Sequence, residues 1–153
     1  MSPRRRRWPW GLAGALAIAL VAAGLWAYSS RRAGTVSNRY AVHAVARYDD
    51  AVAAGDAARA CQLLAPPAQA AIVTAARPYG RFTCRRLLSV AIAQLGPRGR
   101  KQIGGAAIRI VSSDADRARV IVSLGGGRKP TELWVLRVGS RWLVGSSVAG
   151  VSP

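Results

Sequence analysis

Few residues in this chain have the types and the spacing that a catalytic site needs. His43 is the only histidine, and no serine, cysteine or acid lies at a spacing that would make it half of a catalytic pair. Asp49 and Asp50 are adjacent, so a helix would point their side chains about 100° apart instead of toward one substrate. We therefore expect all three residues to lie on a solvated helix surface and assign no catalytic residue.

The chain contains two cysteines, Cys61 and Cys84. Two cysteines in a domain outside the cytoplasm predict one disulfide, with two unpaired buried thiols as the alternative. Closing a loop of about 24 residues would contribute about 3.5 kcal/mol to stability. A structural metal site would need four ligands, which two cysteines and one distant histidine do not supply. We therefore expect no metal and no cofactor.

The chain is strongly basic, with 23 Lys and Arg against 6 Asp and Glu. Such a charge attracts polyanions, although a GC-rich coding bias also produces an Arg-rich composition. If two loops meet at one end of a sheet, the candidate polyanion-binding residues are Arg98, Arg100, Lys101, Arg128 and Lys129. Nucleic acid is the less expected partner, because it would also need exposed aromatic side chains, and the tryptophans of the expected strands are needed for packing.

A glycine-rich stretch, residues 125–127, precedes two of these cations. Its backbone N–H groups could hold a phosphate, but a nucleotide-binding loop joins a strand to a helix. Here Pro130 and a further expected strand follow. We interpret the stretch as a flexible hairpin loop.

An uncharged segment, residues 10–28, is long enough to cross a membrane. As a helix it would span about 28 Å, close to the hydrocarbon thickness of a bilayer. Four arginines precede it, at positions 4 to 7, and positive flanks stay in the cytoplasm. The sequence thus predicts a basic cytoplasmic tail (1–9), a transmembrane helix (10–28), a linker (29–37) and an extracytoplasmic domain (38–153). A cleaved signal peptide is the alternative.

Helical spacing of apolar residues continues through the first half of the expected domain. It predicts a helix from near Asn38 to Gly55 and a second from an Asp56 cap to Leu64. Two further helices are expected over residues 68–76, opened by Pro67, and from a Thr83 cap to about Leu95. The stretch Gly96-Pro97-Arg98-Gly99 should end the last helix.

Beyond that stretch the apolar period changes to two, which indicates strands. Strands are expected around residues 108–110 and over 118–124, 131–138 and 141–148. Gly139-Ser140 should form a two-residue hairpin turn that places Arg137 opposite Trp142 and Trp134 opposite Gly145. The predicted fold class is α+β, with three or four helices packed on a curved four-stranded antiparallel sheet.

Two runs resemble the nuclear transport factor 2-like superfamily. YDDAVAAGDAARACQLLAP, residues 48–66, is similar to its first helices, where one helix ends in Gly-Asp and a short helix follows. LWVLRVGSRWLVGS, residues 133–146, resembles its closing hairpin. More narrowly, the chain resembles the membrane-anchored or secreted members of unknown function found in actinobacteria. The resemblance covers about residues 38–148 and implies a cone of helices in a bent sheet, with a pocket.

Enzymes and non-catalytic binding modules both use this fold, so the fold does not choose between them. The superfamily's ketosteroid isomerases and polyketide cyclases place Asp, His or Tyr inside the pocket, whereas Glu132 is the only acid expected in the sheet. We therefore expect a non-catalytic, membrane-anchored binding or accessory module of the cell envelope. Its expected partners are the membrane it crosses once and an anionic lipid, a wall polymer or an envelope protein. A small pocket enzyme of the isomerase or cyclase type is the alternative.

Overall fold

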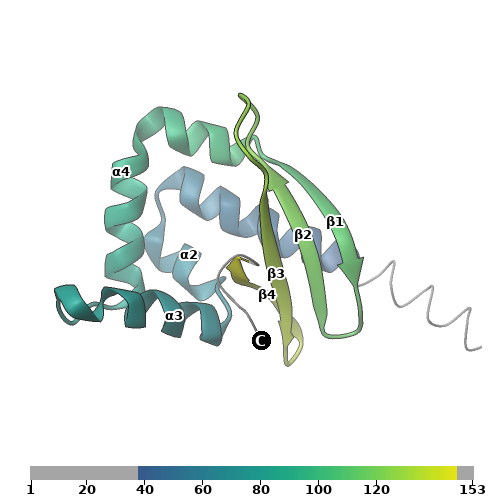
Figure 1. Cartoon of the computed structure of the whole chain (residues 1–153), viewed down its shortest axis with the longest axis horizontal. Coiled ribbons are helices and arrows are strands. Elements are labelled where there is room, and N and C mark those ends of the chain that lie inside the picture. The colour runs from purple at the N-terminus through teal and green to yellow at the C-terminus, as the bar shows by residue number, and fades with distance from the viewer. Residues whose placement is uncertain (1–37, 148–153) are drawn as a thin grey trace, which may run out of the picture. The chain divides into compact units, whose positions relative to one another are not determined.

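The computed structural model describes residues 38–147, so the predicted tail, transmembrane helix and linker lie outside the described residues. The chain divides into two units, residues 1–33 and 34–153, and every described residue belongs to the second. No helix within residues 38–147 is both long and apolar enough to cross a membrane. The described part is α+β, with helices packed on an open four-stranded antiparallel sheet (Figure 1).

The first two helices follow the sequence closely. Residues 38–54 are helical, and Gly55 (φ 80°) ends this helix because a residue without a Cβ takes a positive φ at little cost. Helix α2 (Ala57–Gln62) begins at Asp56, whose carboxylate accepts a hydrogen bond from the Arg59 N–H, as predicted for an N-cap.

Helix α3 (Pro66–Ala76) has proline in its first turn, as predicted, and leads into a 3-10 turn, η1 (Arg77–Tyr79). Helix α4 (Cys84–Gly104) begins at the predicted Thr83 cap. The prediction that helix ends near Leu95 is wrong in part. Gly96 (φ 63°, ψ 178°) breaks the regular backbone there, but a second helical stretch follows. Pro97 is tolerated because it opens that second stretch, where its missing N–H costs nothing.

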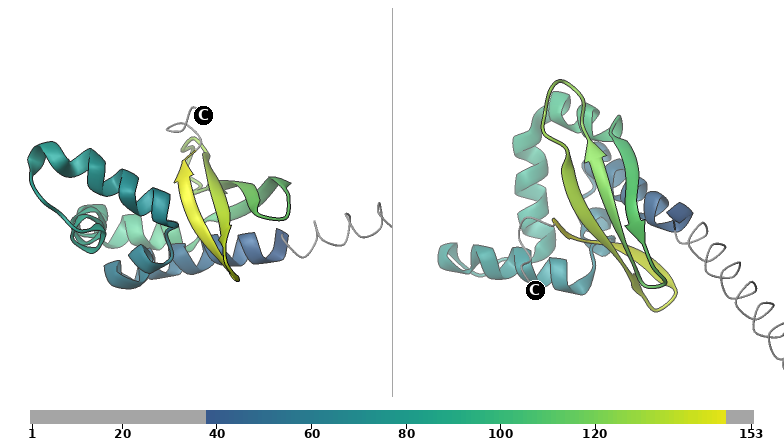
Figure 2. Two further views of the ribbon diagram at one scale, coloured as in Figure 1. Left: turned by 90° about the horizontal axis from the view of Figure 1, so that it is seen from below. Right: turned by 45° about the vertical axis from the view of Figure 1, so that its right-hand side comes forward.

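The four predicted strands are confirmed and form a meander in the order β1-β2-β3-β4. They are β1 (Ala107–Ser113), β2 (Arg117–Ser123), β3 (Thr131–Val138) and β4 (Arg141–Ser147). Both further views show the sheet strongly twisted, with the helices on one of its faces (Figure 2). The inner face carries alternate apolar side chains, among them Val120, Val122 and Val135, as the period of two requires.

The β3–β4 pairing confirms the predicted partners Arg137 and Trp142. Beyond them the register shifts between Leu133 and Val135, so that Gly145 and Ser146 together lie opposite Trp134. A Cβ on Gly145 would stand 2.8 Å from the Trp134 carbonyl oxygen, closer than van der Waals contact permits. The glycine is therefore what allows this bulge to form.

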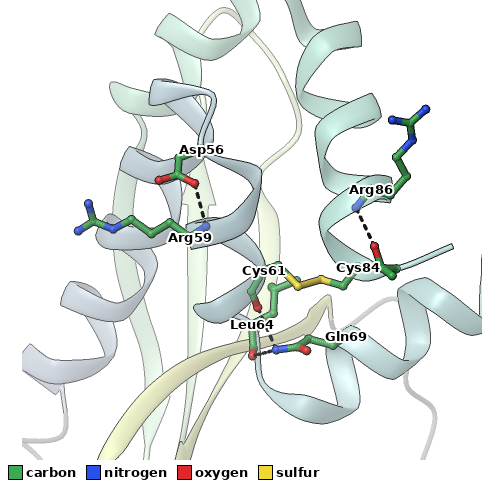
Figure 3. Close-up of a disulfide and its surroundings, with 8 residues drawn as sticks. Asp56, Arg59, Cys61, Leu64, Gln69, Cys84 and Arg86 are labelled. Carbon is green, nitrogen blue, oxygen red and sulfur yellow. Dashed lines mark hydrogen bonds between the residues drawn. A yellow bond between two sulfur atoms is a disulfide. The ribbon is translucent and has the colours of Figure 1, made fainter.

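The predicted disulfide joins Cys61 of α2 to Cys84 of α4, with their Cα atoms 6.0 Å apart (Figure 3). Beside it the Gln69 side-chain amide donates to the backbone carbonyls of Cys61 and Leu64, both at 2.9 Å. The bond to Leu64 satisfies a carbonyl just beyond the C-terminal end of α2, whereas the Cys61 carbonyl also accepts from the Leu64 N–H at 3.2 Å. The disulfide and Gln69 together fix α2 between α3 and α4.

Candidate functional site

A cavity of about 280 Å³ opens between the helix over residues 38–54, α4 and the inner face of the sheet. Its wall is overwhelmingly apolar, because α4 and the sheet both turn their aliphatic side chains toward it. Its polar side chains are those of Tyr48, Asp49 and Thr131. The remaining lining residues are Val52, Leu88, Ala91, Ile92, Leu95, Ile103, Val122, Leu124 and Leu133.

Asp49 is the one buried charged or polar residue of the described chain, with 8% of its surface exposed. The expectation that it lies on a solvated helix face is therefore wrong. Its neighbour Asp50 is exposed, in agreement with that expectation. The Oδ2 atom of Asp49 is buried and has no hydrogen-bond partner among the described residues. A buried acceptor without a hydrogen-bond partner destabilises the folded state, and such atoms are rare in native proteins. One that is present therefore needs an explanation.

The environment of Asp49 raises its pKa from 3.8 to about 7. Burial is the main cause, because the apolar wall stabilises an ionised carboxylate far less than water does. The negative charge of Asp50 adds to the effect. Burial, and secondarily Asp49, also raises the pKa of Tyr48. Asp49 can therefore hold or release a proton near neutral pH.

The spacing of residues contained a signal for this burial. Asp49 follows Val45 by four positions and precedes Val52 by three, so it lies on the same helix stripe as two residues that face the core. An acid on an apolar stripe is unusual. The side chains of Asp49 and Asp50 do point in different directions, as predicted. The carboxyl of Asp49 points inward, whereas that of Asp50 points to solvent.

The mouth of the cavity is marked by its most exposed lining residues, Ala91, Leu95 and Thr131. One lip lies on α4, and Leu95 immediately precedes the break at Gly96. The opposite lip is the start of β3, where Thr131 follows the loop that joins β2 to β3. The mouth therefore opens between the α4 break and this loop.

The predicted polyanion-binding residues flank the same region. Arg98, Arg100 and Lys101 follow the α4 break, while Arg128 and Lys129 lie in the β2–β3 loop. In both Figure 1 and the right-hand view of Figure 2, the loop and the second half of α4 lie at the same end of the sheet.

The exposure of these five residues differs. Arg100 is only half exposed, and a Cβ on Gly55 would stand 2.8 Å from its Nη1 atom. It therefore lies against the C-terminal end of the helix over residues 38–54, which favours a cation. The other four residues are exposed.

The other candidate groups, His43 and the glycine-rich loop, lie where the sequence predicted. His43 is exposed on its helix, as predicted. Gly125, Gly126 and Gly127 all have positive φ in the loop that joins two strands, as a hairpin loop predicts. Within residues 38–147 no three potential ligands come together to hold a metal ion.

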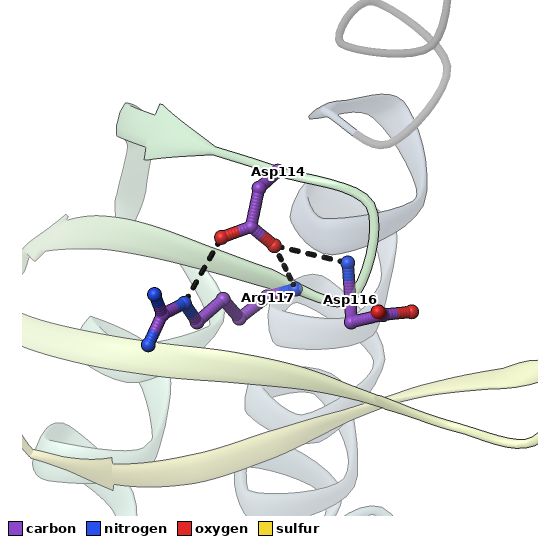
Figure 4. A network of polar contacts seen from close by, with 3 residues as sticks. All are labelled: Asp114, Asp116 and Arg117. Carbon is purple, nitrogen blue, oxygen red and sulfur yellow. Dashed lines mark hydrogen bonds and ion pairs between the residues drawn. The ribbon is translucent and has the colours of Figure 1, made fainter.

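Two further acids lie in the β1–β2 turn. Asp114 accepts backbone hydrogen bonds from Asp116 and Arg117 and pairs with the Arg117 side chain at 2.9 Å (Figure 4). The bond from Asp116, followed by that from the Arg117 side chain, lowers the pKa of Asp114. The pair is exposed and closes the turn, so these acids stabilise local structure and are not placed to act on a ligand in the cavity.

A second hollow, of about 560 Å³, lies beyond the end of α3. It is lined by Val73, Arg77, Gly80, Arg81 and Phe82, and the two arginines and the glycine are exposed. The sequence did not single out these residues. The hollow holds no buried polar group, which distinguishes it from the cavity beside Asp49.

We compared the chain with models of protein families, with curated protein sequences and with solved structures, and none of them matches it. The functional conclusion therefore depends on the geometry of the cavity.

Proposed function

We propose that this chain is a non-catalytic binding module of the cell envelope that holds a small, largely apolar molecule in the cavity beside Asp49. In this proposal residues 10–28 anchor the chain in the membrane and residues 38–153 lie outside it. The observation that carries the binding role is the open apolar cavity with one buried polar atom that has no protein partner. Binding pockets commonly combine an apolar wall with a few polar groups that orient the ligand.

The superfamily assignment belongs to the same proposal. It is supported by the order of elements, in which helices precede a four-stranded meander, and by the short helix that follows Gly55-Asp56. A cone-like arrangement of helices against a bent sheet would account for an internal cavity between the helices and the sheet.

The cavity volume limits the size of the ligand. At about 280 Å³ it is close to the lower end of the range of small-molecule sites. The ligand, or the part of it that enters, is therefore small. It needs one polar group to meet Asp49, which donates a hydrogen bond when protonated and accepts one when ionised.

Blocking the mouth of the cavity should strongly weaken ligand binding. The probe is octanol, added to the full chain in nanodiscs of zwitterionic lipid, and the readout is the methyl chemical shifts of Ile92 and Ile103. We expect Ala91→Trp to weaken octanol binding at least tenfold, because the indole would fill the mouth. Ala93→Trp is the matched control, since Ala93 is exposed on the same helix but does not line the cavity. Cavity methyl shifts that do not respond to octanol in the unaltered chain would contradict the proposal.

A pocket enzyme that moves a proton is the second candidate. It is favoured by Asp49 itself, because a general base works best when its pKa is near the working pH. Exchange with solvent distinguishes the two functions. An enzyme of this kind would exchange the hydrogens beside the carbonyl of a medium-chain ketone for deuterium, and Asp49→Asn would stop the exchange. Binding of the ketone without hydrogen exchange would contradict the enzyme and support the non-catalytic binding module.

A further inference from the structure

The mouth of the cavity differs from its interior in charge. The interior offers apolar side chains and one carboxyl group, whereas the two lips lead directly into basic stretches. Arg98 lies three residues after the lip residue Leu95, and Arg128 and Lys129 lie two to three residues before the opposite lip residue Thr131. An apolar interior with a cationic rim has the polarity pattern that an anionic amphiphile would complement.

No acid neutralises this rim among the described residues. The two ion pairs found there join Arg117 to Asp114 and Arg119 to Glu132, and neither uses a rim cation. Glu132 follows the lip residue Thr131, but it pairs with Arg119 at 2.9 Å. The other turn acid, Asp116, lies with Asp114 in the β1–β2 turn, at the opposite end of the meander from the β2–β3 loop. The positive charge at the rim is therefore available to a ligand.

We propose that the ligand of this cavity is an anionic amphiphile, whose apolar body enters the cavity and whose anionic group stays at the mouth between Arg98 on one lip and Arg128 and Lys129 on the other. This inference rests on the binding function proposed above and adds the charge and the orientation of the ligand. Asp49 sets the orientation, because it is buried at the inner wall while the cations are exposed. An anionic group at the inner wall would lie beside a carboxyl, whereas at the mouth it meets cations.

Three probes with the same apolar chain test the inference: octanoate, octanol and octylammonium. Each is titrated into the full chain in zwitterionic nanodiscs, and binding is read from the methyl shifts of Ile92 and Ile103. These shifts report the cavity itself and not partition into the lipid. We expect octanoate to bind about fivefold more tightly than octanol, because exposed cations each add a modest attraction. Octylammonium should bind most weakly.

Two variants locate the preference at the rim. Arg128→Gln/Lys129→Gln should reduce the affinity for octanoate to that for octanol and leave octanol unchanged, and Arg98→Gln should do so in part. Arg39→Gln/Arg141→Gln is the matched control. Both of its residues are exposed, and they lie at the other end of the sheet, beside the Asn38–Ser113 hydrogen bond and the β3–β4 turn. We expect this control to keep the preference for octanoate.

The outcomes separate the two proposals. Two results would contradict an anionic ligand: octanol or octylammonium binds as tightly as octanoate, or the Arg128→Gln/Lys129→Gln variant keeps the preference for octanoate. In either case the proposed binding function would still stand. If none of the three probes moves the cavity methyl shifts, the binding function fails and the inference fails with it.

Discussion

Removal of the disulfide should destabilise the domain by about 3.5 kcal/mol. The bond between Cys61 and Cys84 spans 23 positions of the chain, and loss of such a crosslink restores conformational freedom to the unfolded chain. The expected loss is a large share of the free energy of unfolding of a typical domain, which is about 5–15 kcal/mol. The variant is Cys61→Ala/Cys84→Ala, and the measurement is urea unfolding of the full chain. The fully buried Val120 and Val135 supply methyl signals that report this domain alone.

Reductant provides the control for the disulfide prediction. It should destabilise the unaltered chain by a similar amount and leave the double variant unchanged, because that variant has no bond to reduce. An unaltered chain that unfolds at the same urea concentration with and without the bond would show that the crosslink contributes nothing to stability.

Replacement of Asp49 by Asn should make the domain more stable at pH 8. Folding raises the pKa of Asp49 from 3.8 to about 7, so between these values the folded state binds more protons than the unfolded state. Its free energy of unfolding must then fall as the pH rises through this window and level off above pH 7. The shift corresponds to at most about 4 kcal/mol, and on the order of 2 kcal/mol once water at the open mouth screens the charge.

The pH profile separates this effect from a change in packing. Asp49→Asn removes the titration, so its advantage of on the order of 2 kcal/mol at pH 8 should shrink toward zero near pH 4. Asp50→Asn is the matched control, because Asp50 is exposed and acts on Asp49 only through its charge. It should keep most of the pH dependence. A difference in the free energy of unfolding between Asp49→Asn and the unaltered chain that stays constant from pH 4 to pH 8 would contradict the raised pKa of Asp49.

The elements of the described fold were largely predictable because their signals are local. A two-residue turn at Gly139-Ser140 and the apolar alternation on either side fix strand β3 at Thr131–Val138 and pair Arg137 with Trp142. The Asp56 and Thr83 caps mark two helix starts for the same reason. Gly96-Pro97 was less informative, because a break in the backbone does not say whether helix resumes beyond it.

The cavity could not be predicted from local signals. Asp49 is placed by its helix stripe, but its missing partner depends on α4 and the sheet, whose side chains facing the cavity are apolar except for Thr131 at its mouth. The rim cations were identified as candidates, yet their position beside a cavity mouth depends on how the α4 break and the β2–β3 loop approach one another. Such relations join residues distant in sequence, and residue types and spacing do not encode them directly.

The most direct test of the binding cavity is the titration of the Asp49 carboxyl carbon by NMR in the full chain, with and without octanol. Asp49→Asn identifies the signal. We expect a titration midpoint at pH of about 7, which octanol should move upward because it replaces water beside the carboxyl. A midpoint near the ordinary value of 3.8 that octanol leaves unchanged would place Asp49 in water and contradict a ligand site beside it.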